Sequence, residues 1–374
     1  MAGTREEAPG TTTASGTPGD ATPPGGPPDL PGAAARRGRP HGAAPGGRLL
    51  AVVARGGRLL VAAGGPAGPG RTRHGRIVVA LALVTALLTL LHPWLPEGPG
   101  NLGSLVQTFA PWAGAAVLAL LGAALLLRSR PALASALTAA VVWGSFFVPA
   151  LGDRTGTGGD LTVVSHNVDD ANPDPAGTAR ALVASGAQLI ALQELTRPAT
   201  AAYARTLAAT HPYHVVEDTV GLWSTRPLRD ATPLPIMPWT RALRATADTP
   251  EGPVTVYVAH LASVRVRLDS GFTTRSRNEA ARLLTGELRA ETAERVLVVG
   301  DLNGTTGDTA LAPLLSGLRP AQEEAGAGFG FTWPAAFPVA RIDHVLARGL
   351  TPVSAWNLPA TGSDHLPVAA SLRR

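Results

Sequence analysis

VLVVGDLN, at residues 296–303, is the stretch that best indicates how this sequence folds. Residues 296–299 form a continuous apolar run, which is typical of a strand buried on both faces. Gly300 ends the run and is followed by an acid, Asp301, and an amide, Asn303. Asp, Asn and Gly also form turns, so this stretch alone is equally compatible with a simple turn. The ends of the other strands decide whether Asp301 and Asn303 belong to a site.

Composition and charge divide the chain into two unlike parts. The 374 residues contain no Cys, which excludes disulfides and thiolate metal sites. Every basic residue is Arg: residues 1–159 hold 13 Arg against 6 acids, and residues 160–374 hold 19 Arg against 21 acids. The high pI therefore belongs to the N-terminal part. The nearly neutral C-terminal part gives little support to nonspecific nucleic-acid binding, which depends on neutralising phosphates.

The N-terminal part contains two predicted units. Residues 1–75 are rich in Gly, Pro, Ala, Thr and Arg without periodicity, which predicts a disordered region. Residues 76–152 contain long segments without Asp, Glu or Arg, at residues 77–95, 104–127 and 131–151. A helix that spans a bilayer needs about 20 apolar residues, so residues 76–152 are predicted to form three transmembrane helices. A buried bundle in a soluble domain is the alternative, and three such runs in tandem disfavour it.

The positions of Arg predict the orientation of these helices. Three Arg precede the first segment and two lie between the second and third, whereas the loop at residues 96–103 has none. The positive-inside rule places the N-terminus in the cytoplasm. Because three crossings follow, residues 160–374 are expected outside the cell, as the extracytoplasmic domain of a multi-pass protein of the cell membrane.

Residues 160–374 alternate strand-like and helix-like patterns, which predicts an α/β domain. The first strand, helix and strand are expected at residues 161–168, 176–185 and 188–195. A second such unit is expected at residues 254–261, 274–290 and 296–299. The two strands of each unit are predicted to be parallel neighbours. Further strands are expected at residues 221–224, 242–247, 341–347 and 366–372.

Polar residues occupy the ends of six of these strands. They are Asn167, Glu194, His260, Asp301 with Asn303, Asp343, and Asp364 with His365. Ligands of open α/β sheets bind beyond strand ends. A single polar residue there would suit a turn, whereas this set of acids, amides and histidines favours a functional site.

The ordered motifs HNV, LQE, AHL, GDLN, RIDH and SDHLPV resemble those of the endonuclease/exonuclease/phosphatase family, whose fold is DNase I-like. The resemblance covers residues 160–374. The sequence looks most like membrane-anchored bacterial members of the family, which also carry a stretch like Thr332-Trp333-Pro334. It implies a four-layer α-β-β-α sandwich of two mixed sheets, here preceded by the three transmembrane helices. It also implies a metal-dependent hydrolase that cleaves phosphodiester or phosphomonoester bonds with an activated water.

The resemblance further implies a metal site. Glu194 would be the main metal ligand, with Asn167 and Asp364 in support. Hard oxygen ligands suit Mg²⁺ or Mn²⁺, and Ca²⁺ is a further alternative. Asp169 and Asp170 are interpreted as loop acids rather than ligands.

The catalytic residues implied by the resemblance are His260, Asp301, Asn303, Asp343 and His365. Asp301 would orient or deprotonate the water, and Asn303 would hold it. His260 and His365 would donate to the phosphate, and Asp343 would hydrogen-bond one of these two histidines. His166, His344 and Trp333 lie beside these motifs and are interpreted as structural.

The substrate remains open, because the fold does not choose among nucleases, sphingomyelinases and sugar-phosphate phosphatases. We expect a phosphoester of a lipid, a nucleic acid or a small molecule, and a membrane tether favours a substrate at the bilayer or a scavenged extracellular one. The bilayer is the other expected partner, and no protein partner can be inferred. The alternatives are an extracellular nuclease, which could use Arg265, Arg267, Arg275 and Arg277, and a catalytically silent receptor for a phosphorylated ligand. Loss of a catalytic position would mark the receptor, and none is lost.

Overall fold

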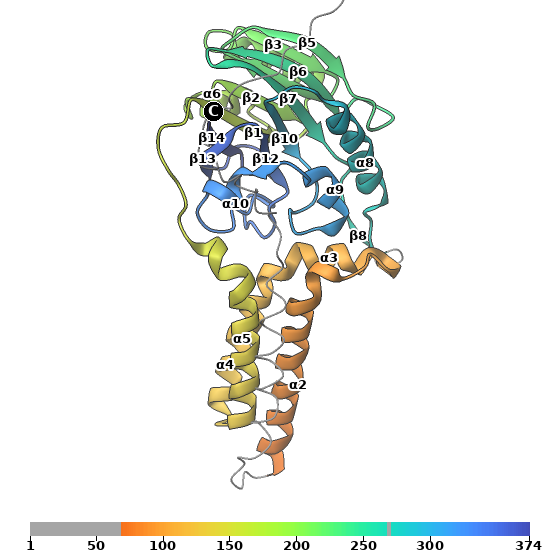
Figure 1. Cartoon of the computed structure of the whole chain (residues 1–374), viewed down its shortest axis with the longest axis vertical. Helices are drawn as coiled ribbons and strands as arrows, with labels where there is room; N and C mark the ends of the chain where they lie inside the picture. The colour runs from red at the N-terminus through yellow and green to blue at the C-terminus, as the bar shows by residue number, and fades with distance from the viewer. Residues whose placement is uncertain (1–68, 268–270) are drawn as a thin grey trace, which may run out of the picture. The chain divides into compact units, whose positions relative to one another are not determined.

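A computed structural model of the chain describes residues 69–267 and 271–374 (Figure 1). The predicted disordered region at residues 1–75 therefore lies almost wholly outside the described residues. Three helical segments are long and apolar enough to cross a membrane, namely Thr72–Trp94, Leu102–Leu126 and Arg130–Leu151. They coincide with the three segments predicted from the sequence.

The second of these segments is interrupted, although the sequence predicts one helix. It consists of α3 (Leu102–Phe109), a 3₁₀ turn at Ala110–Trp112, and α4 (Ala113–Leu126). Pro111 lies in the turn, and proline cannot donate the backbone hydrogen bond that a continuing α-helix needs. As a result, α3 is a separate short helix.

The other two segments are α2 (Pro69–Leu91) and α5 (Arg130–Leu151), which pack with α4. Ala82, Ala124 and Ala136 are buried where these helices meet. Small side chains allow helix backbones to approach closely, which is the usual packing of helices in membranes.

The remainder of the described chain contains two six-stranded sheets. The first has the order β13 (Thr351–Asn357), β14 (Val368–Arg373), β1 (Leu161–Asn167), β2 (Leu189–Gln193), β4 (Val220–Ser224) and β3 (Tyr213–Glu217). The second has the order β11 (Arg319–Pro320), β12 (Asp343–Arg348), β10 (Val296–Asp301), β7 (Gly252–His260), β6 (Ala242–Thr249) and β5 (Leu228–Pro233). A separate two-stranded ribbon consists of β8 (Val266–Arg267) and β9 (Gly271–Phe272).

Both sheets are mixed, as expected. β1 and β2 are parallel, and so are β7 and β10, which confirms the two predicted units. The other strand pairs are antiparallel. β4 and β6, the strands predicted between the two units, lie in different sheets.

The apolar run in β10 is explained by its two buried faces. Leu297 and Val299 pack in the core between the two sheets. Val296 and Val298 point the other way and pack with Leu284 of α8 (Arg275–Ala290). Because successive side chains of a strand point to opposite faces, a strand covered on both sides needs an apolar residue at every position.

Helices cover the outer face of each sheet and complete the four layers (Figure 1). On the first sheet, α6 (Pro175–Val183) and α7 (Arg197–Leu207) pack through Leu182 and Tyr203 against Ile190. On the second, α8 and α9 (Ala312–Leu315) pack in a core of their own with β10. The short α10 (Ala321–Ala325) follows β11. The architecture is the predicted α-β-β-α sandwich.

A buried ion pair joins α8 to the loop that follows β10. Arg277 Nη2 donates to Asp308 Oδ2 over 2.7 Å, and both side chains are fully buried. Ser104 Oγ of α3 donates to the same carboxylate over 2.9 Å. α3 is thereby bonded to the loop that carries Asn303.

Breaking this pair should strongly destabilise the fold. Arg277→Met leaves the Asp308 carboxylate buried without its cation, which typically costs about 3–5 kcal/mol. Arg282→Met, on the same helix, breaks only an exposed pair with Glu279 and should cost about 1 kcal/mol or less. Chemical unfolding of the solubilised full chain measures both. Adding Asp308→Asn to Arg277→Met should recover part of the loss, and equal losses for the two single variants would contradict the assignment.

Candidate active site

Strand register brings three predicted site residues together in the second sheet. Asp301 at the end of β10 is the register partner of His260 in β7 and of Asp343 in β12. Asn167, at the end of β1 in the first sheet, reaches across and donates from Nδ2 to Asp301 Oδ2 over 3.1 Å. The ends of both sheets therefore meet at Asp301.

The backbone at this meeting point is unusual. Gly300 has φ 144°, and a Cβ there would lie 1.8 Å from the carbonyl oxygen of Ala259, so only glycine fits. Asn303 and Glu194 have φ 47° and 60°. Asn tolerates the left-handed region, whereas Glu does so at a cost of about 1–3 kcal/mol. A strained residue held by its surroundings suggests that the position of the Glu194 carboxylate matters to function.

Asp301 is a buried carboxylate with several donors. Its side chain accepts from the backbone N–H of Asn303 over 2.8 Å, and from the Nδ2 atoms of Asn303 and Asn167 over 3.1 Å each. Only 1% of the residue is exposed. Burial raises the pKa of Asp301, and the positive charge of His365 opposes part of this rise. The result is a fixed carboxylate that is a stronger base than an exposed Asp.

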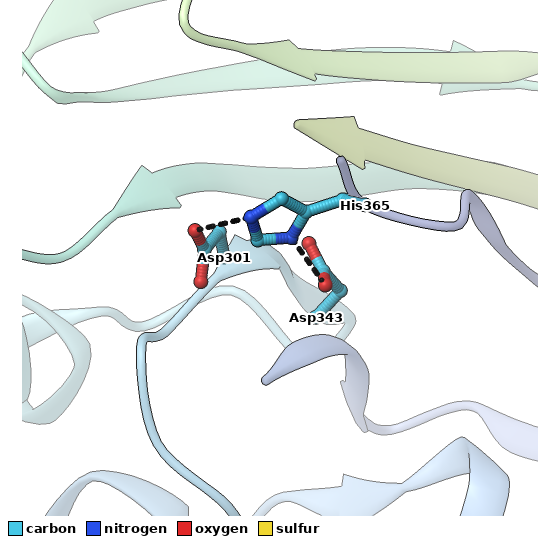
Figure 2. Close-up of side chains that lie close together, drawn as sticks. All are labelled: Asp301, Asp343 and His365. Carbon is cyan, nitrogen blue, oxygen red and sulfur yellow. Dashed lines mark hydrogen bonds and ion pairs between the residues drawn. The ribbon is translucent and has the colours of Figure 1, made fainter. Parts of the chain in front are cut away.

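His365 lies between two carboxylates, as Figure 2 shows. Its Nδ1 is 2.9 Å from Asp343 Oδ2 in a hydrogen bond, and its Nε2 is 3.8 Å from Asp301 Oδ2. Burial alone would lower the pKa of His365, but the carboxylates of Asp343 and Asp301 raise it to about 10. His365 is therefore a charged imidazolium at neutral pH. It is also the histidine that bonds Asp343, a choice that the sequence left open.

His260 differs from His365 in charge. Its Nε2 lies 3.5 Å from Glu194 Oε1 and 3.6 Å from Asp301 Oδ2. Burial and the charge of Arg241, which contacts the imidazole ring, lower the pKa of His260 well below its usual value. The imidazole is thus neutral and donates through one nitrogen only.

Arg241 is a site residue that the sequence analysis missed. It stands immediately before β6, and the pairing of Ala242 with Ala259 sets it beside His260. Burial lowers the pKa of Arg241, and the negative charges of Asp301 and Glu194 offset only part of this decrease. Its place next to a predicted strand at residues 242–247 is the signal that could have found it.

Carboxylates gather at Glu194. One carboxylate oxygen from each of Asp169, Asp170 and Glu194 lies within 4.8 Å of the other two. Asp169 and Asp170, interpreted from the sequence as loop acids, thus join the predicted main ligand. Three hard oxygen donors at this spacing fit a divalent cation such as Mg²⁺ or Mn²⁺.

Asp364, another predicted metal ligand, is not one of these three carboxylates, and the amide Asn167 adjoins them through the backbone of Asp169. Asn167 bonds Asp301, and its Oδ1 accepts from the backbone N–H of Asp169 over 3.1 Å. Asp364 accepts from Trp333 Nε1 over 3.1 Å and lies 3.8 Å from His365 Nε2. Asn167 is therefore positioned to orient the cluster, and Asp364 to contact a bound molecule from the side of His365.

Several of the candidate site residues line a pocket of about 500 Å³. Its lining includes Glu194, Asp301, Asn303, Asp364, His365 and Trp333.

His166 and His344, interpreted from the sequence as structural, are both buried. The ring of His166 bonds Thr361 Oγ1, and the ring of His344 bonds the carbonyl of Gly304. Burial lowers the pKa of His166 to about 3 and that of His344 to about 4, so both are neutral.

Several solved structures are similar to this chain at low sequence identity. Humanized TDP2 of D. rerio is 18% identical, with 57% of this chain and 99% of that chain covered and a TM-score of 0.49. The mannosyl-6-phosphatase of Bacteroides thetaiotaomicron is 15% identical, with coverage of 57% and 99% and a TM-score of 0.48. Sphingomyelinase C from Streptomyces griseocarneus is 18% identical, with coverage of 58% and 100% and a TM-score of 0.44. No curated protein matches the chain.

The sequence profile of the Endonuclease/Exonuclease/phosphatase family matches residues 164–365, which is more than half of the 374 residues. The matched region contains most of the first β-α-β unit, all of the second, and every candidate site residue from Asn167 to His365. The mixed sheets and their flanking helices form the DNase I-like sandwich that the resemblance implied. The chain belongs to the endonuclease/exonuclease/phosphatase family.

Proposed function

We propose that this chain is a membrane-anchored, divalent-metal-dependent hydrolase of phosphoester bonds. The observation that carries the proposal is the buried carboxylate of Asp301 beside the charged imidazolium of His365, at one end of a pocket. Membership of a family of phosphoester-cleaving proteins supports the same reaction class. The proposed catalytic domain is residues 160–374, and the proposed anchor is residues 76–152.

Asp169, Asp170 and Glu194 would hold the metal, because their oxygens form the open carboxylate cluster at the pocket. A bound divalent cation would neutralise phosphate charge and stabilise the leaving oxygen. Asn167 bonds both Asp301 and the backbone of Asp169, and so couples the base to the metal-binding residues.

Asp301 is the proposed base that accepts the proton of the attacking water. Its raised pKa favours this transfer, and the donors from Asn167 and Asn303 fix the carboxylate in one orientation. A positioned base of this kind typically contributes a factor of about 10²–10⁴ to the rate.

His365 is the proposed donor to the phosphate oxygens. Asp343 holds its Nδ1, which fixes the ring and maintains the positive charge. Charge fixed in advance at the place where negative charge develops is an effective means of transition-state stabilisation. Neutral His260 donates a further hydrogen bond, and Arg241 adds a second positive charge beside it.

Hydrolysis of bis(p-nitrophenyl) phosphate by the purified full chain tests the reaction class. We expect turnover with Mg²⁺ or Mn²⁺, and loss of that turnover when EDTA removes the metal. Equal rates with and without EDTA would contradict the metal requirement. Binding of phosphoesters without any hydrolysis would instead support the silent receptor.

The proposed roles of Asp301 and Glu194 can be separated by substitution. Asp301→Asn should retain Mn²⁺ affinity in calorimetry and lose about 10²-fold or more in turnover, because only the base is lost. Glu194→Gln should weaken Mn²⁺ binding and regain part of its activity at high Mn²⁺. Asp218→Asn, in the exposed β3–β4 turn, is the matched control and should change neither quantity. Identical Mn²⁺ titrations for Glu194→Gln and wild type would refute the assignment.

The proposed topology places the N-terminus in the cytoplasm and the catalytic domain outside. Because the chain has no Cys, a single introduced thiol reports its own side of the membrane. Ala201→Cys, exposed on α7, should react with an impermeant maleimide in intact cells, whereas Ala34→Cys should react only after permeabilisation. The reverse pattern would place the enzyme in the cytoplasm.

A further inference from the structure

One side of the active-site pocket comes from outside the predicted catalytic domain. Thr108 and Phe109, at the end of α3, line the same pocket as Asp301 and Glu194. α3 continues through the turn at Ala110–Trp112 into α4, within a segment long and apolar enough to cross a membrane. The pocket is therefore composite, with a contribution from the proposed membrane anchor.

Buried hydrogen bonds hold α3 in this position. Ser104 Oγ donates to the Asp308 carboxylate over 2.9 Å, and Gln107 Oε1 accepts from the backbone N–H of Thr309 over 3.0 Å. Ser104 and Gln107 are 0% and 3% exposed. A buried polar group is costly to leave unpaired, so these bonds fix α3 against the loop that follows β10. Phe109 is thereby a fixed part of the pocket.

The side formed by Phe109 is apolar. Val264, Val266 and Phe272, from the segment between β7 and α8, line the pocket together with Ile342 and Phe109. The carboxylates and His365 contribute the polar part of the lining. A volume of about 500 Å³ lies within the range of pockets that enclose a molecule of drug size. A phosphate and a small alcohol would leave the apolar part unfilled.

Exposed aromatic side chains extend the apolar surface toward α4. Trp333 lines the pocket and is 37% exposed. Phe337 is 67% exposed, and its ring centroid lies 6.1 Å from that of Trp112, immediately before α4. Aromatic residues are enriched where membrane helices meet the aqueous phase. Exposed aromatic side chains therefore lie both at the pocket, at Trp333, and beside Trp112 within the proposed membrane span.

We infer that Phe109, with Val264 and Phe272, binds an alkyl chain of the phosphoester substrate while its phosphate lies at Asp301 and His365. This inference rests on the proposed function. It disfavours nucleic acid as the preferred substrate. Among the residues whose side chains the structure describes, Arg265 is the one Arg that lines the pocket, and tight binding of nucleic acid requires several phosphate contacts.

A pair of chromogenic diesters with one leaving group tests the inference. Methyl p-nitrophenyl phosphate and octyl p-nitrophenyl phosphate differ only in the alkyl chain, and both release p-nitrophenol. The full chain in lipid nanodiscs with Mg²⁺ should hydrolyse the octyl ester with at least a tenfold higher kcat/KM, because each fully buried methylene contributes roughly fourfold to affinity. Phe109→Ser should reduce the octyl-to-methyl ratio of kcat/KM several-fold.

Two further variants make this result interpretable. Leu118→Ser lies on α4 at 71% exposure, away from the pocket, and should retain the wild-type ratio, which controls for partitioning of the octyl ester into the bilayer. Val264→Ser changes the pocket without altering α3, and should lower the ratio even if Phe109→Ser fails to fold.

The outcomes distinguish this inference from the proposed function. Metal-dependent hydrolysis with equal kcat/KM for both esters overturns the inference and leaves the reaction class intact. A higher kcat/KM for single-stranded DNA than for the octyl ester also overturns the inference. Absence of hydrolysis of either ester with Mg²⁺ or Mn²⁺ overturns both.

Discussion

The site depends on keeping a carboxylate buried at Asp301. A carboxylate at 1% exposure is costly to ionise unless it is paired and hydrogen-bonded. Here the compensation comes from His365, whose imidazolium lies between Asp301 and Asp343, and from the amide donors of Asn167 and Asn303. Asn303 lies two residues after Asp301, whereas Asn167 and His365 are far from it in the sequence. The compensation from Asn167 and His365 therefore exists only once the two sheets have packed.

That requirement explains the backbone at the site. Gly300 lets β10 approach β7 so closely that no Cβ fits, and the register then sets Asp301 beside His260. The left-handed backbone at Asn303 turns its amide back to Asp301. The geometry of the proposed base, Asp301, is thus set by strand pairing. Paired strands are stiffer than a loop, and a site on rigid elements keeps its geometry better.

The fold could be predicted from the sequence because its signals are local. The apolar run in β10 follows from burial on both faces, and the two β-α-β units follow from alternating periodicity and short connections. Strand ends likewise identified Asp301, His260 and Asp343, because neighbouring strands must end together. The grouping of Asp169 and Asp170 with Glu194 could not be predicted, since a turn with a left-handed residue at Asp169 directs these side chains. Arg241 was missed for a related reason, because its contact with His260 depends on which strand pairs with β7.

The contribution of α3 to the pocket is the feature that the sequence predicts least, because the apolar composition of this segment indicates only a membrane span. Ser104, Gln107 and Thr108 depart from that composition, and the first two each bond a residue more than 200 positions away. The buried pair of Arg277 and Asp308 supplies the acceptor for Ser104, so the stability of the catalytic domain and the placement of α3 share one set of contacts. α3 therefore crosses the proposed boundary between the two parts. It lies in the sequence of the proposed anchor, whereas its buried contacts are with the proposed catalytic domain. A domain cut at residue 160 would keep Asp301 and His365 and lose Phe109, and with it one side of the pocket.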